Sequence, residues 1–202
     1  EHFVLMTSYG RELRKSARQE ILRKAMELRD VPRRQLKDEE LAFFRDWWVV
    51  AVRLAVEVLE GRAVPEEIAA RIVPPVKPDD VRAALDLLLS LGIARKAQGG
   101  KLSIVDQHLT VDGENGRRAV ADYQRKIFEL ASESVDRFPR ELRDISTLSV
   151  TVDAPAFEDI RGILKDCRRR IQARVADVVE PDRALQVALS IFPLVPATTE
   201  GK

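Results

Sequence analysis

Residues 78–105 read PDDVRAALDLLLSLGIARKAQGGKLSIV, and this stretch decides the fold. Its first half has the pattern of a helix over 78–91, because Pro78 suits the first helical position and apolar residues follow at helical spacing. Gly92 is a typical residue for the end of a helix. Two short apolar segments, 93–97 and 101–105, then flank a Gln-Gly-Gly turn, which predicts a hairpin. The stretch therefore predicts a helix that runs directly into a hairpin.

The residues before this stretch add two more helices. A helix is predicted over 39–60, apolar on most of its sides, and a short one over 65–71, followed by a break at Val73-Pro74-Pro75-Val76. The order helix, helix, turn, helix, hairpin is that of a winged-helix-like domain, expected over residues 39–112. Trp47 and Trp48 lie on the longest helix, and we expect them to be core anchors, with a partner or effector surface as the alternative.

The residues after the hairpin have a different pattern. Helices are predicted over 117–137 and 155–178, and each is followed by a segment of alternating apolar residues, 145–152 and 183–195. Alternation predicts half-buried strands. We therefore expect an α+β, mostly helical fold: the winged-helix-like domain is followed, over 113–196, by a small α/β layer in which these two strands are neighbours.

The two ends of the chain are predicted to lie outside both domains. Residues 1–38 are expected to be a helical connector, with its helix over 3–29, and residues 197–202 a disordered tail. The chain begins with Glu1 rather than Met, so we expect its natural start to lie upstream. No segment predicts a membrane span or a signal peptide, which favours a cytoplasmic protein.

The charge of the chain is nearly balanced, with 34 Lys and Arg residues against 33 Asp and Glu residues, and no segment is strongly basic. A protein that binds nucleic acid through phosphates usually has a basic patch, so DNA contacts would require locally clustered charge. The candidates for DNA binding lie on the predicted recognition helix and the wing: Lys77, Arg82, Arg95, Lys96 and Lys101. The same helix carries Asp79, Asp80 and Asp86, which oppose phosphate binding, so a structural or dimer-forming use of the winged helix remains the alternative.

The sequence offers no residues for catalysis. The two histidines, His2 and His108, have no second ligand at metal spacing, and no histidine is placed to activate a serine or cysteine. No phosphate-binding glycine loop is present. We therefore expect no enzyme activity, no catalytic residue, no metal and no cofactor. Cys167, the single cysteine, is expected to be a buried structural residue.

A second group of basic residues lies on the predicted helix 155–178. Arg168 and Arg169 are its centre, and they are either a partner or effector surface or part of a solvated helix face paired with nearby carboxylates.

Four segments together resemble a family of bacterial helix-turn-helix transcription regulators that share a C-terminal domain of unknown function. They are FRDWWVVAVR at 44–53, residues 69–92 with their Val-Pro break, REL-RDISTL at 140–148, and residues 186–194 with the FPL motif at the end. The resemblance covers roughly residues 20–195. It implies that a Cro-like DNA-binding head precedes this region in the family, and it supplies no ligand and no catalytic residue.

The sequence therefore predicts the regulatory and dimerisation region of a bacterial transcriptional regulator, associated with DNA and forming a homodimer, whose effector is unknown. Two alternatives remain open: a winged helix that binds DNA itself, and a protein-interaction scaffold that never binds DNA.

Overall fold

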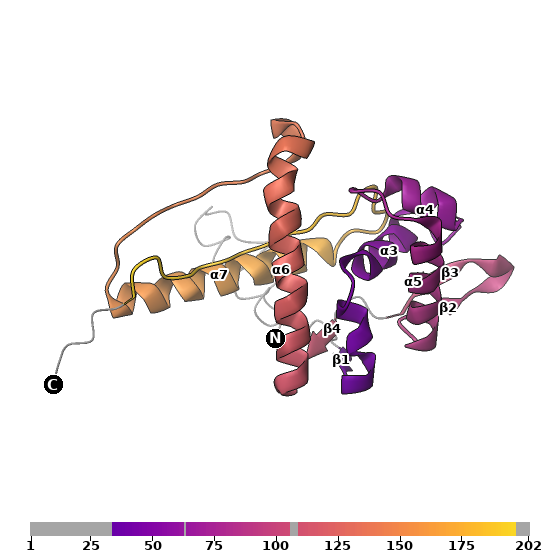
Figure 1. Cartoon of the computed structure of the whole chain (residues 1–202), viewed down its shortest axis with the longest axis horizontal. Coiled ribbons are helices and arrows are strands. Elements are labelled where there is room, and N and C mark those ends of the chain that lie inside the picture. Colours follow the sequence, from indigo (N-terminus) through magenta and orange to yellow (C-terminus); the bar gives the residue numbers. More distant parts are fainter. Residues whose placement is uncertain (1–33, 63, 106–108, 197–202) are drawn as a thin grey trace, which may run out of the picture. The chain divides into compact units, whose positions relative to one another are not determined.

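The computed structural model describes residues 34–62, 64–105 and 109–196, and these residues form a mostly helical α+β chain with two small sheets (Figure 1). The chain divides into two compact units. The described part of the larger unit spans residues 34–146 and 179–186, and that of the smaller unit spans 147–178 and 187–196. The expected connector helix over 3–29 and the expected tail over 197–202 lie outside the described residues.

The larger unit contains the predicted helix–helix–hairpin order. It includes α3 (Trp47–Val58), α4 (Pro65–Arg71) and α5 (Pro78–Ser90), followed by an antiparallel hairpin of β2 (Ala94–Lys96) and β3 (Leu102–Ile104). A short 3-10 turn, η2 (Gln98–Gly100), joins the two strands. The predictions for α4, α5 and the hairpin are confirmed. They rest on local signals, a proline in the first turn of each helix and glycines in the turns.

The end of α5 shows why the helix and the hairpin that follows it can be predicted from the sequence. Gly92 has φ +66°, and its N–H donates to the carbonyl of Leu89, while the N–H of Ile93 donates to the carbonyl of Leu88. These two bonds form a Schellman motif, which favours glycine at the left-handed position. Leu88 and Ile93 are both fully buried, so the cap also fixes the hairpin against the core.

The prediction of one continuous helix over 39–60 is wrong. Residues 38–44 form a 3-10 helix, η1 (Asp38–Phe44), and α3 starts only at Trp47. Asp46 separates the two, because its backbone is extended, with φ −122° and ψ +127°. Because of the break, Phe43 before it and Val49 after it both face the core and are buried. A single straight helix that is apolar on most of its sides would not need such a break.

A second sheet was not anticipated from the sequence. β1 (Arg34–Leu36) pairs in parallel with β4 (Leu109–Val111), so that Leu36 lies opposite Val111. Leu36 is buried in the same core as the three helices, although it falls in the stretch expected to be a connector. The core as a whole consists of residues from β1, η1, the three helices and the start of the hairpin: Leu36, Phe43, Val49, Val52, Val56, Ile68, Ala69, Ile72, Val81, Ala84, Leu88, Ile93 and Ala94.

A long helix, α6 (Gly113–Arg137), follows β4 and belongs to the larger unit. It begins four residues earlier than predicted, because the carboxylate of Asp112 accepts the N–H of Gly113 at 2.9 Å and caps the helix there. A single 3-10 turn, η3 (Arg140–Leu142), comes after it.

The described part of the smaller unit contains one helix, α7 (Ala154–Val175), with drawn-out chain before and after it (Figure 1). The prediction of strands over 145–152 and 183–195 is wrong, since neither segment belongs to a ladder. Both segments alternate apolar residues as a strand does, but their apolar side chains are largely exposed, and no other described segment pairs with them. The described chain thus lacks the neighbour that would make them a sheet.

Candidate functional site

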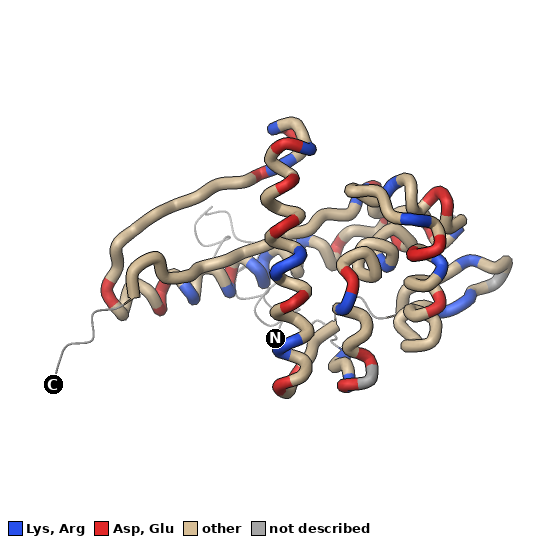
Figure 2. The backbone as a smooth tube through the Cα atoms, in the orientation of Figure 1, with Lys and Arg blue, Asp and Glu red and all other residues tan. Residues whose placement is uncertain are grey.

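The hairpin brings together three of the five predicted DNA-binding residues. Arg95 and Lys96 lie on β2 and are exposed, and Lys101 stands at the start of the return strand, where its carbonyl accepts the N–H of Ala97 at 2.7 Å. Successive residues of a strand point to opposite faces. Arg95 and Lys96 therefore do not belong to a single basic face, although the hairpin as a whole is basic (Figure 2).

The remaining two candidates lie at the other end of α5. Lys77 is the residue before the helix, and the hairpin leaves from its far end, roughly 20 Å away for a helix of this length. Arg82 bonds to two carboxylates, Asp79 in its own helix and Glu66 on α4. Its guanidinium is therefore already neutralised by neighbours.

The exposed surface of α5 is acidic rather than basic. The Asp79 side chain is 89% exposed, and Asp86, two turns later, is exposed as well. Figure 2 shows acidic and basic residues intermixed over α4 and α5. A helix that reads DNA through its exposed face would bring these carboxylates close to phosphates, which is unfavourable.

Trp47 and Trp48 form the first turn of α3. Their rings meet edge to face, with centroids 6.1 Å apart, and both are half-buried against the core cluster. This packing accounts for the two side chains as anchors of the larger unit.

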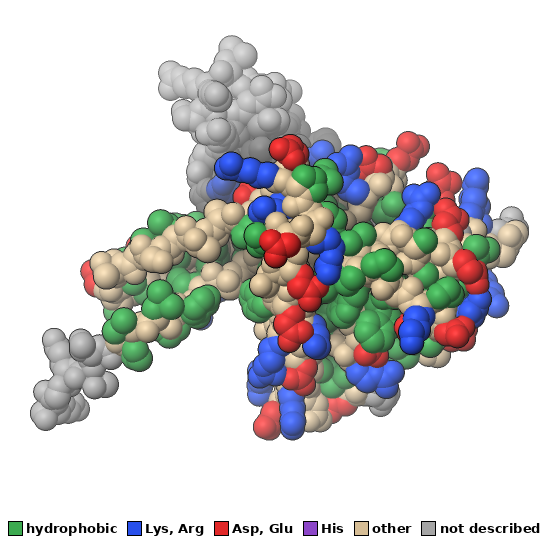
Figure 3. All heavy atoms as spheres, turned by 45° about the horizontal axis from the view of Figure 1, so that its top comes forward, with side chains coloured by type: hydrophobic (Ala, Val, Ile, Leu, Met, Phe, Trp, Pro, Cys, Tyr) green, Lys and Arg blue, Asp and Glu red, His purple; other side chains and the backbone are tan. Residues whose placement is uncertain are grey.

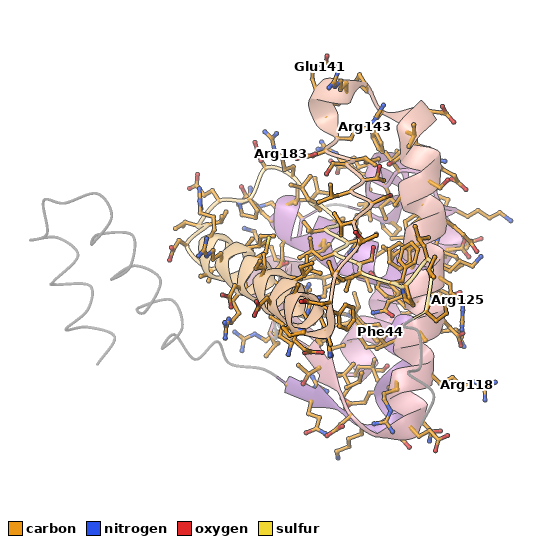
Figure 4. All side chains as sticks on the ribbon, turned by 90° about the vertical axis from the view of Figure 1, so that its left-hand side faces the viewer. Phe44, Arg118, Arg125, Glu141, Arg143 and Arg183 are labelled. Carbon is orange, nitrogen blue, oxygen red and sulfur yellow. The ribbon has the colours of Figure 1, made fainter. Side chains whose placement is uncertain are left out.

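An aromatic contact that the sequence analysis did not single out connects η1 to α6. Phe44 lies beside α6 (Figure 4), and its ring meets that of Tyr123 edge to face, with centroids 5.5 Å apart. The Tyr123 hydroxyl donates to Oε1 of Gln186 at 3.2 Å, and burial raises the pKa of Tyr123 to about 12. This contact attaches residues 179–186 to the larger unit. The only sequence signal for it was the place of Tyr123 on the apolar side of its helix.

The basic residues of α7 are divided between solvent and a groove. Arg168 is exposed, and Arg169 bonds to Asp166 one turn earlier, as expected of a solvated helix face. Cys167 is half-buried rather than buried. It lies in a groove of about 440 Å³ along α7, lined by Ile163, Asp166, Cys167, Arg170, Ile171, Arg174 and Val175.

The smaller unit carries an unusual amount of exposed apolar surface. Of the residues of α7, all of them described, only Ala173 is buried. On the extended segment before it, Leu148, Val150 and Val152 are exposed, and the segment after it ends with exposed Phe192, Leu194 and Val195. Hydrophobic side chains lie open on this part of the molecule, at the left of the space-filling view (Figure 3). Such a surface is typical of a protein-binding site.

Among the described residues, no group of three His, Cys, Asp or Glu side chains is placed to hold a metal ion. His2 and His108 lie outside the described residues. No helix in the described part of the chain is long and apolar enough to cross a membrane.

A family model described as "Domain of unknown function (DUF4423)" matches residues 28–194. Comparisons with curated proteins and with solved structures give no match.

Proposed function

The chain belongs to the DUF4423 family, and we propose that it is the regulatory and dimerisation region of a bacterial transcriptional regulator. The place in transcription rests on the resemblance of residues 44–53, 69–92, 140–148 and 186–194 to regulators that carry a domain of unknown function. The structure supports different roles for the two units: the smaller unit would make protein contacts, and the winged helix would serve for packing.

The observation that carries this proposal is the exposed apolar surface of the smaller unit. Leu148, Val150 and Val152 stand in line on an extended segment without a charged residue, in a chain of which 33% is charged. The cores of protein–protein interfaces are depleted of charge in the same way. A module that joins two subunits needs such a surface, whereas a module that only reads DNA does not.

The acidic face of α5 supports the second half of the proposal. In a helix-turn-helix domain the recognition helix lies in the major groove, between two phosphate backbones. Here that helix exposes Asp86, and its Arg82 is paired with both Asp79 and Glu66 of α4, a group whose net charge is negative. The winged helix is therefore poorly suited to reading DNA alone, and it serves to hold the subunit together.

One observation favours a second candidate, DNA binding by this chain itself. Arg95 and Lys96 are exposed on the wing, and wings of this kind can contact the minor groove or the phosphates beside it. A third candidate, a scaffold that never acts on transcription, shares the protein-binding surface with the first.

Fluorescence anisotropy with labelled genomic DNA fragments, at about 50 and 200 mM salt, distinguishes the first two candidates. The proposal expects no binding at the lower salt concentration. Binding that falls steeply with salt, and that Arg95→Glu with Lys96→Glu abolishes, would overturn it in favour of the second candidate. The matched control is Arg117→Glu with Arg118→Glu, an adjacent exposed pair on α6 that changes the net charge equally.

Dimerisation is tested by fusing the chain to a DNA-binding head that represses its operator only as a dimer. The proposal expects the fusion to repress and the head alone to be inactive. If the fusion does not repress although it is produced at the same level, the proposed function fails. A small molecule that copurifies with the chain and is identified by native mass spectrometry would favour a regulator over a scaffold.

A further inference from the structure

One segment of the smaller unit has the sequence pattern of a strand, but no strand among the described residues lies beside it. Residues 147–152, TLSVTV, lie in the drawn-out segment between η3 and α7 (Figure 1), and none of their backbone groups forms a backbone hydrogen bond with another described residue. Their apolar side chains, Leu148, Val150 and Val152, share one face, and Thr147, Ser149 and Thr151 share the other. This segment presents a complete strand edge together with an apolar face.

The sequence of this edge lacks the residues by which proteins normally protect such edges. Unpaired strands are usually blunted by a charged residue, a proline or a bulge, because they otherwise pair with another chain. Residues 145–152 contain no charge, no proline and no glycine. The second extended segment, which is also exposed, contains no charge from residue 184 to residue 196.

The exposed apolar side chains of the smaller unit add up to an area close to that of half an interface. The described part of the smaller unit has twelve exposed large apolar side chains, whose exposed fractions add up to about seven fully exposed side chains. At roughly 60–120 Å² for each side chain this is about 400–800 Å² per subunit. Two such surfaces meet the lower part of the range of about 1,200–2,000 Å² buried by stable complexes.

The sequence of the edge is complementary to itself. In an antiparallel pair of two copies, Ser149 or Val150 lies opposite its own counterpart at the two-fold axis. In both registers the apolar side chains of the two strands remain on one face and the hydroxyl side chains on the other, because side chains alternate with a period of two. A symmetric dimer needs a surface that matches itself in this way.

We propose that residues 147–152 pair in antiparallel fashion with the same residues of a second copy, in a homodimer whose two-stranded ribbon brings Leu148, Val150 and Val152 of both copies together on one apolar face. The inference deepens the proposed function, because it rests on dimerisation and assigns it to one strand. The partner is a second copy of this chain rather than another protein, since one segment supplies both the free edge and its matching pattern.

The first test is sedimentation velocity of the full chain and of two variants with matched exposure. Val150 is 58% exposed on the proposed strand, and Val64, which precedes α4 in the larger unit, is 57% exposed. Val150→Asp places a carboxylate in the interface twice, once from each subunit, and is expected to raise the dimer dissociation constant at least about 100-fold. Val64→Asp is expected to leave it unchanged.

The outcomes separate the inference from the proposed function. A wild-type chain that sediments as a dimer and a Val150→Asp variant that sediments as a folded monomer support the inference. Equal dimer affinity of Val150→Asp and wild type overturns the inference and leaves the proposed dimeric function standing. A wild-type chain that is monomeric at about 100 μM, well above the Kd of stable complexes, overturns both.

Disulfide crosslinking provides the second test and does not depend on how Val150→Asp folds. In a Cys167→Ser background, Ser149→Cys or Val150→Cys places two cysteines opposite each other, with Cα atoms about 4.5–5.5 Å apart, within the range for a disulfide. At least one of the two is expected to form covalent dimers much faster than Val64→Cys. If neither exceeds Val64→Cys, the antiparallel pairing of residues 147–152 is refuted.

Discussion

Replacement of Gly61 by alanine tests how the hairpin is held against α3. Gly61 follows the C-terminus of α3 with φ +68°, and its N–H donates to the carbonyl of Val56 at 2.8 Å. Its own carbonyl accepts the N–H of Leu102, at the start of β3, at 3.0 Å. A Cβ atom at residue 61 would lie 1.9 Å from the carbonyl oxygen of Leu102, so the backbone of one of the two segments would have to move.

The expected cost follows from these two features. The left-handed conformation costs a residue with a side chain about 1–2 kcal/mol. The forced shift adds the loss of the Leu102–Gly61 hydrogen bond, about 0.5–1.5 kcal/mol, and some loss of packing around it. Gly61→Ala should therefore destabilise the larger unit by about 2–4 kcal/mol.

Gly99 provides a control that isolates the clash. It also has a positive φ, +75°, but a Cβ there would meet no atom within 4 Å. Gly99→Ala should therefore cost only the conformational part, about 1–2 kcal/mol at most. Urea unfolding followed by tryptophan fluorescence measures both variants, because Trp47 and Trp48 lie on α3 in the same unit. If the two variants differ by less than about 0.5 kcal/mol, the close approach of Gly61 to β3 is not what restricts this position.

Two further predictions concern pH. Because the pKa of Tyr123 in the folded chain is about 12 and its ordinary value is 10, its stabilising effect is complete below pH 10 and is lost as the pH rises to 12. Unfolding free energy should fall across that window by at most about 2 kcal/mol, because the partly exposed side chain is screened by solvent. Tyr123→Phe should remove this fall; an unchanged slope in the variant would contradict the prediction. The pKa of Glu40 is held below its ordinary value of 4.5, first by the backbone N–H of Lys37 and then by the guanidinium of Arg34. The stabilising effect of the Glu40 carboxylate is therefore present above pH 4.5 and is lost as the pH falls through the folded pKa. Glu40→Gln should lower the unfolding free energy by about 1–2 kcal/mol at neutral pH. If the variant loses as much unfolding free energy at about pH 3 as at pH 7, the charge of Glu40 is irrelevant to stability.

The parts of the fold that could be predicted are those set by local signals. Pro65 and Pro78 occupy the first turns of their helices, and Gly92 ends α5, so α4, α5 and the hairpin follow from the sequence. The parallel pairing of β1 with β4 could not be foreseen, because it joins three-residue strands more than seventy residues apart, and no periodicity is visible over such a length.

The candidate site shows the same division. The exposure of Arg95 and Lys96 follows from their place beside the hairpin turn. In contrast, Arg82 is engaged by Glu66 on a different helix, a contact between residues 16 positions apart that only the packing of α4 on α5 creates. The sequence could list the basic residues near the predicted recognition helix, but not which of their charges are already neutralised.

The incorrect prediction of strands at 145–152 and 183–195 has a physical explanation. Alternation of apolar and polar residues shows that a segment has one face to bury, but a strand exists only when a second backbone accepts its hydrogen bonds. The alternation in TLSVTV is real, and its apolar face is left exposed by the described residues of the chain. A segment with the pattern of a strand, no charge and no pairing partner among the described residues has the properties that the proposed intermolecular sheet requires of each copy. The incorrect prediction and the proposed dimer therefore rest on one property: residues 147–152 have the pattern of a strand, and no described residue of the chain pairs with their backbone.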